Sequence, residues 1–342
     1  MKAVIVPAPG SVTIANVPDA LPPKPGEVMI KLKAMGICGS DIHVYHGRSS
    51  FASYPRIIGH ELAGEVVAVG DSNGKVFIGD HVVIDPVNSC GECYACSIGR
   101  SNVCKNIKVL AAHVDGGFRE YITSPIKNVH KIDKRVPWEI AATVEPYSIA
   151  AEALARGDIS QDDSVLICGA GPIGITLLQA SLRITKKIMI LDNVGERIHK
   201  AKSMGNVETL NPQTENASQK IMDWTGGEGV NLILEATGNV KVMESCISEW
   251  ASQAGRVVTL GFSASPMSIA PLDIMKRELD IRGSRLSRNR FPEVISWIEN
   301  KEVNPEKLIS HKFSFYDAEN AIKQVDLDPA GTLKVILSLE DM

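Results

Sequence analysis

The sequence predicts an α/β protein made of a mainly β region followed by a doubly wound parallel sheet. Its 342 residues are more than one hydrophobic core usually serves, so two domains are expected. Up to about residue 145 the chain is rich in Val, Ile, Gly and Pro in short alternating segments, which is typical of strands joined by turns. From about residue 148, apolar strands alternate with segments of helical length, as in a parallel sheet covered by helices.

The elements follow in that order along the chain. In the first region, "EVMIKLKAMG" (27–36) and "ELAGEVVAVG" (61–70) predict strands. In the second, "DSVLICGAGPIGITLLQASLRI" (163–184) predicts a strand, a glycine turn and a helix, and the strands "KKIMILD", "VNLILEATG", "GRVVTLGF" and "ELDIRGS" follow. A helix at 290–301 and a strand at 332–339 close the chain. We expect domains at 1–148 and 149–284, with 285–342 returning to the first.

The composition gives no reason to expect a nucleic acid or an anionic membrane as partner. The chain is 44% hydrophobic and 22% charged, with 36 basic and 40 acidic residues and a net charge of −4. No apolar run reaches the roughly 18 residues of a membrane span. The start, "MKAVIVPAPG", is typical of a first strand rather than a signal peptide. We therefore expect a cytoplasmic, reducing setting.

Four of the seven cysteines lie within fifteen residues, in "CGECYACSIGRSNVC". Cytosolic cysteines in close pairs are more often metal ligands than disulfides. The spacing C-x2-C-x2-C-x7-C lets the thiolates of Cys90, Cys93, Cys96 and Cys104 close a tetrahedron around Zn²⁺. The alternatives are unliganded thiols, in a sequence too polar for a core, and a zinc ribbon on nucleic acid, for which the loop has too few basic residues. A structural zinc site is predicted.

The segment "GAGPIG" has the order G-x-G-x-x-G, follows a strand and opens a helix. Glycines there allow a pyrophosphate to approach the helix N-terminus. Asp192, at the end of the next strand, would accept hydrogen bonds from ribose hydroxyls and repel a 2'-phosphate, which favours NAD over NADP. The alternatives are a packing turn with a surface aspartate, or a flavin. The expected contacts in the turn are Gly169, Gly171, Pro172, Ile173 and Gly174.

A second group of metal-binding side chains lies in "GICGSDIHVYHG" (36–47) and "GHE" (59–61). Taken alone, each cysteine or histidine there would more often be a buried thiol or a hydrogen-bonded imidazole. Together, a soft thiolate, an imidazole and carboxylates beside a nucleotide fold are what an open catalytic zinc site needs. The sequence therefore predicts a second zinc site in the first domain.

With "GICGSDIH", "GHE", the four-cysteine lobe, "DGGFREY" and "GAGPIG" in this order, the whole chain resembles the zinc-dependent medium-chain alcohol and polyol dehydrogenases. The resemblance implies a GroES-like mainly β domain with two zinc ions, one catalytic and one structural, and a Rossmann domain with NAD. It matches Cys38 and His60 to catalytic zinc ligands and the four clustered cysteines to the structural site.

Where simple alcohol dehydrogenases have a third ligand cysteine, this chain has Glu145, in "TVEPYSIA". The polyol, sugar-acid and threonine branches of the family look like this and also have a glutamate in "GHE". Adjacent side chains on an extended segment point to opposite faces, so His60 and Glu61 should not both face one metal without local distortion. Glu61 and Glu145 are therefore alternative third ligands, or partners of a ligand.

The resemblance implies an NAD-dependent oxidoreductase. Zinc would lower the pKa of a substrate hydroxyl, and a hydride would pass to the nicotinamide. Ser40 and His43 match the family's proton relay, which runs through the cofactor ribose to solvent, although a turn hydroxyl and a surface histidine are the plainer interpretations. The remaining expected cofactor contacts are Arg197, Leu260, Gly261, Phe262 and Ser284.

Within the family, "SYPRIIGHE", "AAHVDGGFREY" and "GSRLSRNRFPEVI" resemble the bacterial sugar-acid branch, which includes hexonate 5-dehydrogenases for L-gulonate, L-idonate or L-galactonate and a starvation-sensing oxidoreductase. A hexonate carboxylate calls for a guanidinium. Arg285 is the first candidate, followed by Arg48 and Arg56, each of which is otherwise a surface or interface arginine. His113 would face the pocket by analogy.

Two other activities and one other class stay open. A neutral polyol of the sorbitol type or L-threonine would suit the same metal site and would be separated by which substrate supports NAD reduction. A non-catalytic regulator on the same fold would be favoured by loss of a zinc ligand or of the glycine turn, and this chain has both. By analogy with the family, a homodimer or homotetramer is expected.

Overall fold

A computed structural model describes residues 1–71 and 74–339 and divides the chain into two compact units. Unit 1 comprises Met1–Glu145 and Arg288–Met342, and unit 2 comprises Pro146–Ser287. Each unit has its own hydrophobic core. Among the described residues, no helix has the length and apolar character that crossing a bilayer requires.

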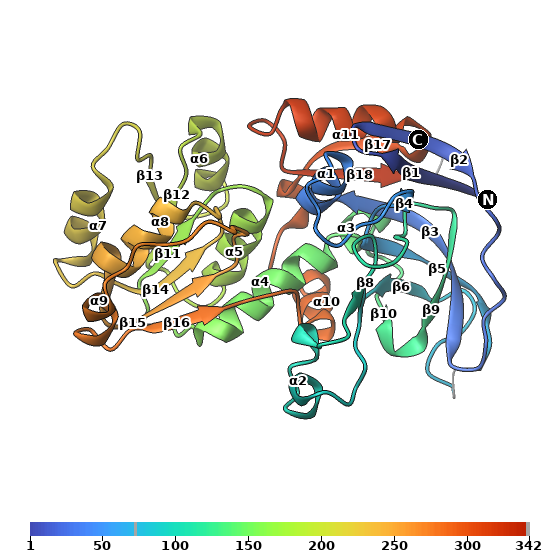
Figure 1. Cartoon of the computed structure of the whole chain (residues 1–342), viewed down its shortest axis with the longest axis horizontal. Helices are drawn as coiled ribbons and strands as arrows, with labels where there is room; N and C mark the ends of the chain where they lie inside the picture. The colour runs from blue at the N-terminus through green and yellow to red at the C-terminus, as the bar shows by residue number, and fades with distance from the viewer. Residues whose placement is uncertain (72–73, 340–342) are drawn as a thin grey trace. The chain divides into compact units, whose positions relative to one another are not determined.

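Unit 1 is mainly β, as predicted (Figure 1). Its sheets have the strand orders β2-β1-β4, β10-β6-β5-β3-β18-β17 with β9 also paired to β3, and β7-β8. All pairings are antiparallel except that of β17 with β18. The strands are β1 (Lys2–Ala8), β2 (Ser11–Asn16), β3 (Glu27–Ile37), β4 (Arg56–Ile57), β5 (Glu61–Val69), β6 (His81–Ile84), β7 (Val87–Asn88), β8 (Lys108–Val109), β9 (Tyr121–Pro125), β10 (Val129–Lys131), β17 (Ile309–Ser314) and β18 (Lys334–Ser338).

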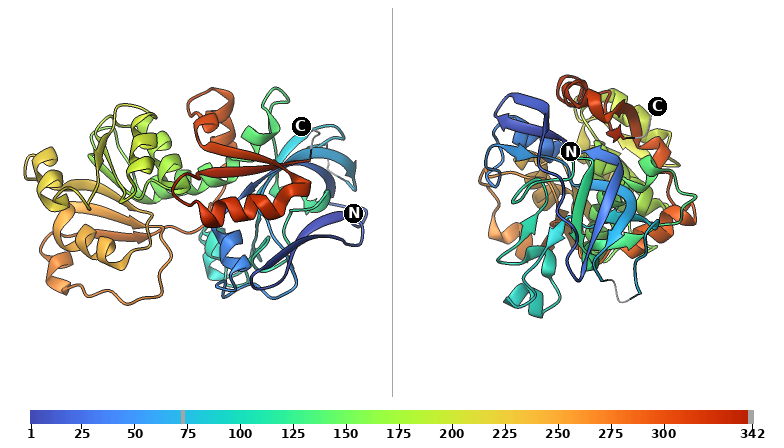
Figure 2. Two further views of the ribbon diagram at one scale, coloured as in Figure 1. Left: turned by 90° about the horizontal axis from the view of Figure 1, so that it is seen from above. Right: turned by 90° about the vertical axis from the view of Figure 1, so that its right-hand side faces the viewer.

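The helices of unit 1 are short, apart from two in the C-terminal segment. That segment, drawn in red, lies beside the blue N-terminal strands in each view (Figure 2). The helical segments are α1 (Gly39–Tyr45), α2 (Tyr94–Ser97), η1 (Ser101–Val103), η2 (Ile126–Asn128), α3 (Trp138–Ala141), α10 (Phe291–Glu299), η4 (Pro305–Lys307), η5 (Phe315–Asp317) and α11 (Ala318–Leu327). Helix α4 (Val144–Gly157) begins in unit 1 and continues in unit 2.

Strand β3 positions the predicted metal ligands because it has a long partner on each side. On one side Gly36 pairs with Glu61 of β5, and on the other Ile37 pairs with Val335 of β18. This register brings the ends of three strands together, although they are far apart in the sequence. The carboxyl end of β3 leads directly into α1, which begins one residue after Cys38.

Unit 2 is a parallel sheet of six strands in the order β13-β12-β11-β14-β15-β16, the strand order of a Rossmann fold. The apolar runs predicted as strands are buried in it, except the edge run Asp280–Gly283, because helices cover both faces of such a sheet. Its elements are β11 (Val165–Cys168), α5 (Pro172–Leu182), β12 (Ile188–Leu191), α6 (Gly195–Lys202), β13 (Glu208–Leu210), α7 (Ala217–Thr225), β14 (Val230–Glu235), α8 (Val240–Ser245), η3 (Cys246–Trp250), β15 (Ala251–Thr259), α9 (Pro271–Met275) and β16 (Asp280–Gly283). The predicted fold class is confirmed.

Candidate metal centres and dinucleotide site

The four-cysteine loop gathers its sulfur atoms in one place. Cys93 Sγ lies 3.5 Å from Cys96 Sγ and 3.8 Å from Cys104 Sγ, and Cys104 Sγ lies 3.4 Å from Cys90 Sγ. All four sulfur atoms lie within 4.8 Å of one another. Thiolates in a tetrahedron around Zn²⁺, with Zn to S distances of about 2.3 Å, stand roughly 3.8 Å apart, so this set fits a structural zinc site.

Backbone N–H groups prepare this loop for anionic sulfur. Two of them lie 3.3 Å from Cys104 Sγ. The N–H groups of Lys105 and Cys96 lower the pKa of Cys93 from 9.0 to about 6, whereas burial raises the pKa of Cys96 to about 11. In the metal-free loop some thiols are therefore already acidic while others keep their protons.

The second donor group consists of Cys38, His60 and Glu61, whose ligand atoms lie within 4.8 Å of one another. His60 and Glu61 converge, so the expected alternation along an extended segment fails here. His60 lies outside the strand, since β5 begins only at Glu61, and Gly59 just before it has φ of 90°, so the alternation of an extended segment does not apply to this pair. A side chain at Gly59 would overlap the ring of Phe118, which keeps this turn glycine.

Asp41 ties the two ligand segments together. Its side chain is 1% exposed and accepts hydrogen bonds from the backbone N–H groups of Cys38 (3.0 Å) and Gly59 (2.9 Å). Its Oδ1 also lies 3.8 Å from His60 Nδ1. Burial lowers the pKa of His60, but the hydrogen bond to Cys38 and the charge of Asp41 outweigh it and hold that pKa well above its usual value.

Lys334, from the first residue of β18, is a buried cation at this site. Its Nζ donates to Glu61 Oε1 at 2.5 Å and to the carbonyl oxygen of Ile37 at 3.1 Å. Burial lowers the pKa of Lys334, but the charges of Glu61 and Cys38 outweigh it and raise the pKa above its ordinary value. The ammonium therefore stays charged inside unit 1.

Glu145, in the first turn of α4, is buried next to this group. Burial raises its pKa from 4.5 to about 7, while the charge of His60 acts to lower it and that of Glu61 to raise it. Within the described part of the chain, the donors that converge are Cys38, His60 and Glu61, without Glu145. Of the two expected third ligands, Glu61 is the one that the geometry favours.

The donor set fits a zinc ion. It offers a thiolate, an imidazole and a carboxylate, the mixture that a catalytic zinc site uses. Glu61 Oε2 is buried and makes no hydrogen bond in the described structure. It lies against Gly36, where a Cβ would come within 1.9 Å of it. A buried carboxylate oxygen without a donor needs a cation, and the three converging donors supply the place for one.

The two expected relay residues lie on α1, directly after Cys38. Ser40 and His43 are both exposed, so either side chain can exchange protons with water. His46, at the end of the same helix, instead binds Asp326 through Nε2 at 2.7 Å. The helix thus carries exposed groups next to a metal donor.

In unit 2 the glycine turn joins β11 to α5 at the edge where the strand order reverses. Gly169 has φ of 101°, and a Cβ at Gly174 would lie 1.8 Å from the carbonyl oxygen of Gly169. Gly171 is the N-cap of α5, Pro172 is its first residue and Ile173 follows in its first turn. The turn therefore needs two of its glycines for backbone conformation and packing, and it leaves helix N–H groups available to an anion.

Asp192 follows β12 and is bound to this turn. Its Oδ2 accepts a hydrogen bond from the N–H of Ala170 at 2.7 Å, and its Oδ1 accepts one from Val194 at 2.8 Å. Arg197 Nη1 lies 3.6 Å from Oδ2, and a Cβ on Gly171 would lie 3.9 Å from the same nitrogen. The structure thus brings Asp192, Arg197 and the glycine turn together.

The other expected cofactor contacts lie at the same edge of the sheet. The N–H groups of Leu260 and Gly261 donate to the carbonyl oxygen of Glu235, and Phe262 is 87% exposed. The N–H of Ser284 donates to Thr259 at 2.9 Å. These residues follow β15 and β16, as the pattern of strands predicts.

Of the arginines proposed to meet a substrate carboxylate, Arg56 has an internal role. Its guanidinium is 8% exposed and binds Asp115 Oδ1 (3.3 Å) and Ser53 Oγ (2.8 Å). Arg48 is exposed at the end of the α1 region, and Arg285 is half-buried after β16. Arg56 does not suit a substrate carboxylate because it is already paired with Asp115. The sequence does not reveal this pairing, since the two residues are 59 positions apart.

His113 lies on the loop that follows β8. Its Nδ1 accepts a hydrogen bond from Val109 at 3.3 Å, and its ring is 5.0 Å from that of Phe51, which is 54% exposed. An exposed aromatic ring next to an imidazole is a surface on which a ligand can pack.

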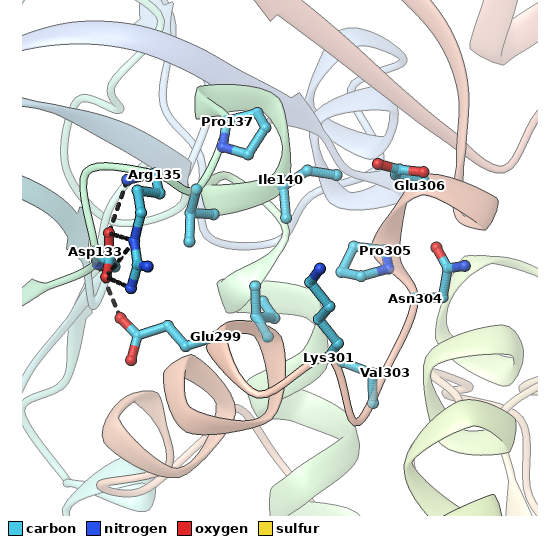
Figure 3. A pocket seen from close by; sticks show the side chains of 12 residues that line it. Asp133, Arg135, Pro137, Ile140, Glu299, Lys301, Val303, Asn304, Pro305 and Glu306 are labelled. Carbon is cyan, nitrogen blue, oxygen red and sulfur yellow. Dashed lines mark hydrogen bonds and ion pairs between the residues drawn. The ribbon is translucent and has the colours of Figure 1, made fainter.

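A cavity of about 590 Å³ lies elsewhere in unit 1, between α3, the end of α10 and η4 (Figure 3). Its lining includes three acidic and two basic side chains, and Asp133 is paired with Arg135. The residues that line it include none of the predicted site residues. We therefore do not place the chemistry there.

Two residues of this site do not stand out in the sequence. Asp41 is one of several polar residues in "GICGSDIH", and Lys334 is a single charge near the C-terminus. The signal for Lys334 was a charged side chain within the otherwise apolar "TLKVILSL". Without the register of β18, β3 and β5, nothing connects it to Glu61.

A GroES-like β unit with two zinc-type donor groups and a Rossmann unit with a dinucleotide turn define a zinc-dependent dehydrogenase. Family models agree: residues 24–134 match the alcohol dehydrogenase GroES-like domain, and residues 172–300 match the zinc-binding dehydrogenase domain. The chain belongs to the zinc-dependent medium-chain dehydrogenases and is an oxidoreductase. The predicted family and enzyme class are confirmed.

Several relatives are similar over most or all of the chain. The starvation-sensing protein RspB of Escherichia coli K12 is 39% identical over all of both chains. The L-galactonate-5-dehydrogenase of the same organism is 31% identical over 86% of each, and the L-threonine 3-dehydrogenase of Pyrococcus abyssi is 35% identical over 94% of each. The crystal structure of rspB from E. coli CFT073 with NADH has 38% identity, covers 99% of both chains and has a TM-score of 0.93. The predicted cofactors, zinc and NAD, agree with these findings.

Proposed function

We propose that this chain is an NAD-dependent dehydrogenase that oxidises a secondary hydroxyl of a polyhydroxy acid. The proposed substrates are hexonates of the L-gulonate, L-idonate or L-galactonate type, oxidised at C5. The convergent, partly buried donor group of Cys38, His60 and Glu61 is the observation that carries the enzyme class. The substrate class is supported by the similarity to an L-galactonate-5-dehydrogenase and by the candidate arginines.

Bound at these donors, Zn²⁺ would act as a Lewis acid that lowers the pKa of a substrate hydroxyl, and NAD would accept the hydride. The protein's part is to hold the donors and to remove the proton. Asp41 fixes the backbones of Cys38 and Gly59, and so orients two donors. Ser40 and His43 then pass the proton outward, and the exposure of His43 lets it release that proton to water.

The cofactor role of residues 149–284 rests on the glycine turn and on Asp192. Ribose hydroxyls would donate to the Asp192 carboxylate, which would repel a 2'-phosphate. Arg197 lies beside that carboxylate, so removing the Asp192 carboxylate would leave the Arg197 guanidinium available to a phosphate. We expect Asp192→Ala with Asn193→Arg to lower kcat/KM for NAD by about 10 to 100-fold, because a hydrogen bond to a charged group contributes about 1.5–3 kcal/mol. If the ratio of kcat/KM for NAD to kcat/KM for NADP did not change, the result would contradict the role of Asp192 at the ribose.

The carboxylate of a hexonate calls for a cationic partner. We propose Arg285 as the partner of the hexonate carboxylate, with Arg48 as the second candidate, and His113 as a polar contact. Arg285 is the residue to test first because it directly follows Ser284, an expected cofactor contact, whereas Arg56 binds Asp115 in unit 1. The relatives that act on L-galactonate and on L-threonine are similar to the chain at comparable levels, so the substrate itself must be measured.

The first experiment is NAD reduction by the zinc-loaded enzyme with aldonates, alditols and L-threonine. A rate confined to one hexonate supports the proposal. Arg285→Ala should then raise KM with little change in kcat, and Arg135→Ala, which removes an arginine that is 90% exposed, should change neither. Equal rates with neutral polyols, or activity with L-threonine alone, would discard the carboxylate partner and keep the metal and cofactor roles. Zinc-loaded protein that binds NADH without oxidising any alcohol would favour a regulator.

The assembly and the location of the protein are also proposals. We expect a homodimer or homotetramer, which light scattering of the purified protein would test. We expect it in the cytoplasm, because most of its cysteines gather in metal-donor groups rather than in disulfides, as suits a reducing compartment. Cell fractionation would test that expectation.

A further inference from the structure

We propose that Lys334 is a positioning residue for the zinc site: its ammonium holds Oε1 of Glu61, so that this carboxylate offers the metal one oxygen only and remains displaceable. The proposal deepens the proposed function and rests on it.

Lys334 Nζ contacts two acceptors on one side of β18, the carbonyl oxygen of Ile37 on the adjacent strand β3 and Oε1 of Glu61 on β5, the next strand beyond it. The side chains of Lys334 and Glu61 are only 3% and 1% exposed. Both ends of this contact come from regular strands of one sheet, so the ammonium has little freedom to move away.

The two carboxylate oxygens of Glu61 have different surroundings. Oε1 is bound by Lys334, whereas Oε2 makes no hydrogen bond in the described structure. Oε2 lies against Gly36, and the absence of a Cβ there leaves room for it. The carboxylate is thus divided into an oxygen held by the protein and an oxygen left over at the donor group.

A buried ion pair is often no more stabilising than apolar residues of the same size, so stability alone is a weak reason for Lys334. A fixed cation beside a dication is also unfavourable for metal binding, since like charges repel strongly away from water. What Lys334 does supply is competition for Glu61, which keeps that ligand weak while Cys38 and His60 bind firmly.

The role differs from that of an ordinary structural ion pair in its consequences. If Lys334 merely braced the site, its loss would loosen the donors and weaken metal binding. If it restrains Glu61, its loss frees both carboxylate oxygens for the metal. The metal would then be bound more tightly, with a higher coordination number, and a substrate hydroxyl would displace Glu61 less readily.

The test uses the full-length protein with Co²⁺ in place of zinc at the catalytic site, since visible cobalt bands weaken as the coordination number rises. Lys334→Met should weaken these bands, tighten the metal against a competing chelator by about tenfold, and lower kcat/KM by about 10 to 100-fold, the range typical of partners of metal ligands. Lys312→Met is the matched control: Lys312 lies on the neighbouring strand β17 and pairs with Glu139 on α3, and its removal should change none of the three.

A double-mutant cycle with Glu61→Gln isolates the pair. In that background Lys334→Met should have no further effect on the bands or the metal affinity, because the residue acts through Glu61. Equal effects in both backgrounds, or weaker metal binding with unchanged bands, would overturn the proposal. If Lys334→Met does not fold, Lys334→Gln, which keeps N–H donors without the charge, should shift the bands in the same direction by less, and no shift would overturn it.

The failure of the proposed function is recognised separately. Wild-type protein that shows no cobalt bands, or shows them but oxidises no alcohol, would count against the enzyme assignment itself. Normal wild-type bands and activity with unchanged behaviour in Lys334→Met would count against Lys334 alone.

Discussion

The two donor groups of unit 1 differ in how the chain builds them. The four-cysteine group comes from one loop of fifteen residues, and its sulfur atoms contact one another and nearby backbone N–H groups. The Cys38 group draws on the end of β3, the turn before β5, the start of α4 and the first residue of β18. Lys334 and Glu61 alone are 273 residues apart in the sequence.

This difference separates a metal that holds a loop from a metal that performs chemistry. A local set of thiolates can be completed by the loop itself, with no position left for a substrate. A set assembled from distant strands is held by the fold, as Asp41 and Lys334 show, so its donors can stay rigid or displaceable as the reaction requires. If this contrast is right, changes at the two groups should separate activity from stability.

The largest effect should come from Cys38→Ser. Loss of the catalytic metal removes several kcal/mol of transition-state stabilisation, so kcat should fall by at least about 10³-fold. Zinc analysis should show one equivalent fewer per chain, and circular dichroism should show the fold retained. An active variant with full zinc content would remove Cys38 from the donor group.

Asp41→Asn should have the next largest effect. The substitution keeps the shape of Asp41 but turns one acceptor oxygen into an amide, which meets the N–H of Cys38 or of Gly59. We expect kcat/KM to fall by about 10 to 100-fold and metal affinity to weaken with it. Titration with a chelator measures the affinity. If the substitution weakened zinc binding at the four-cysteine loop and not at the Cys38 group, the result would contradict the role of Asp41 in orienting the Cys38 group.

Cys104→Ser should act in the opposite way to Cys38→Ser. It removes a thiolate that contacts two other cysteines and accepts two N–H groups, so the loop should lose its zinc. We expect Tm to fall by several degrees, and kcat per folded molecule to stay within about twofold of wild type, since the loop has no part in the chemistry. A large loss of kcat at unchanged Tm would break the contrast between the two groups.

How much could be predicted from the sequence follows the same division. The strand and helix alternation and the four-cysteine spacing are local, so the fold class and the structural site were within reach. Cys38 and His60 stood out through their motifs. The convergence of His60 with Glu61 depends on where the turn at Gly59 ends and β5 begins, which the residue pattern does not mark. The contact of Lys334 with Glu61 depends on the register of three strands and is not a property of a short segment. Arg56 is a case in which a long-range contact removes a candidate, because its pairing with Asp115 is not visible in the sequence around it.

The smallest effect, and the finest test of the contrast, is the pH dependence of the metal-free protein. Burial raises the pKa of Glu145 from 4.5 to about 7, so between these pH values the folded protein keeps a proton that the unfolded chain releases. The contribution of Glu145 to the free energy of unfolding is therefore lost as pH rises through that range. Backbone N–H groups lower the pKa of Cys93 from 9.0 to about 6, so its contribution is lost as pH falls. Urea midpoints of metal-stripped protein from about pH 5 to about pH 8 should therefore rise relative to wild type at high pH in Glu145→Gln and fall there in Cys93→Ser. Shifts of the same sign in both variants would mean that the two groups are not electrostatic opposites.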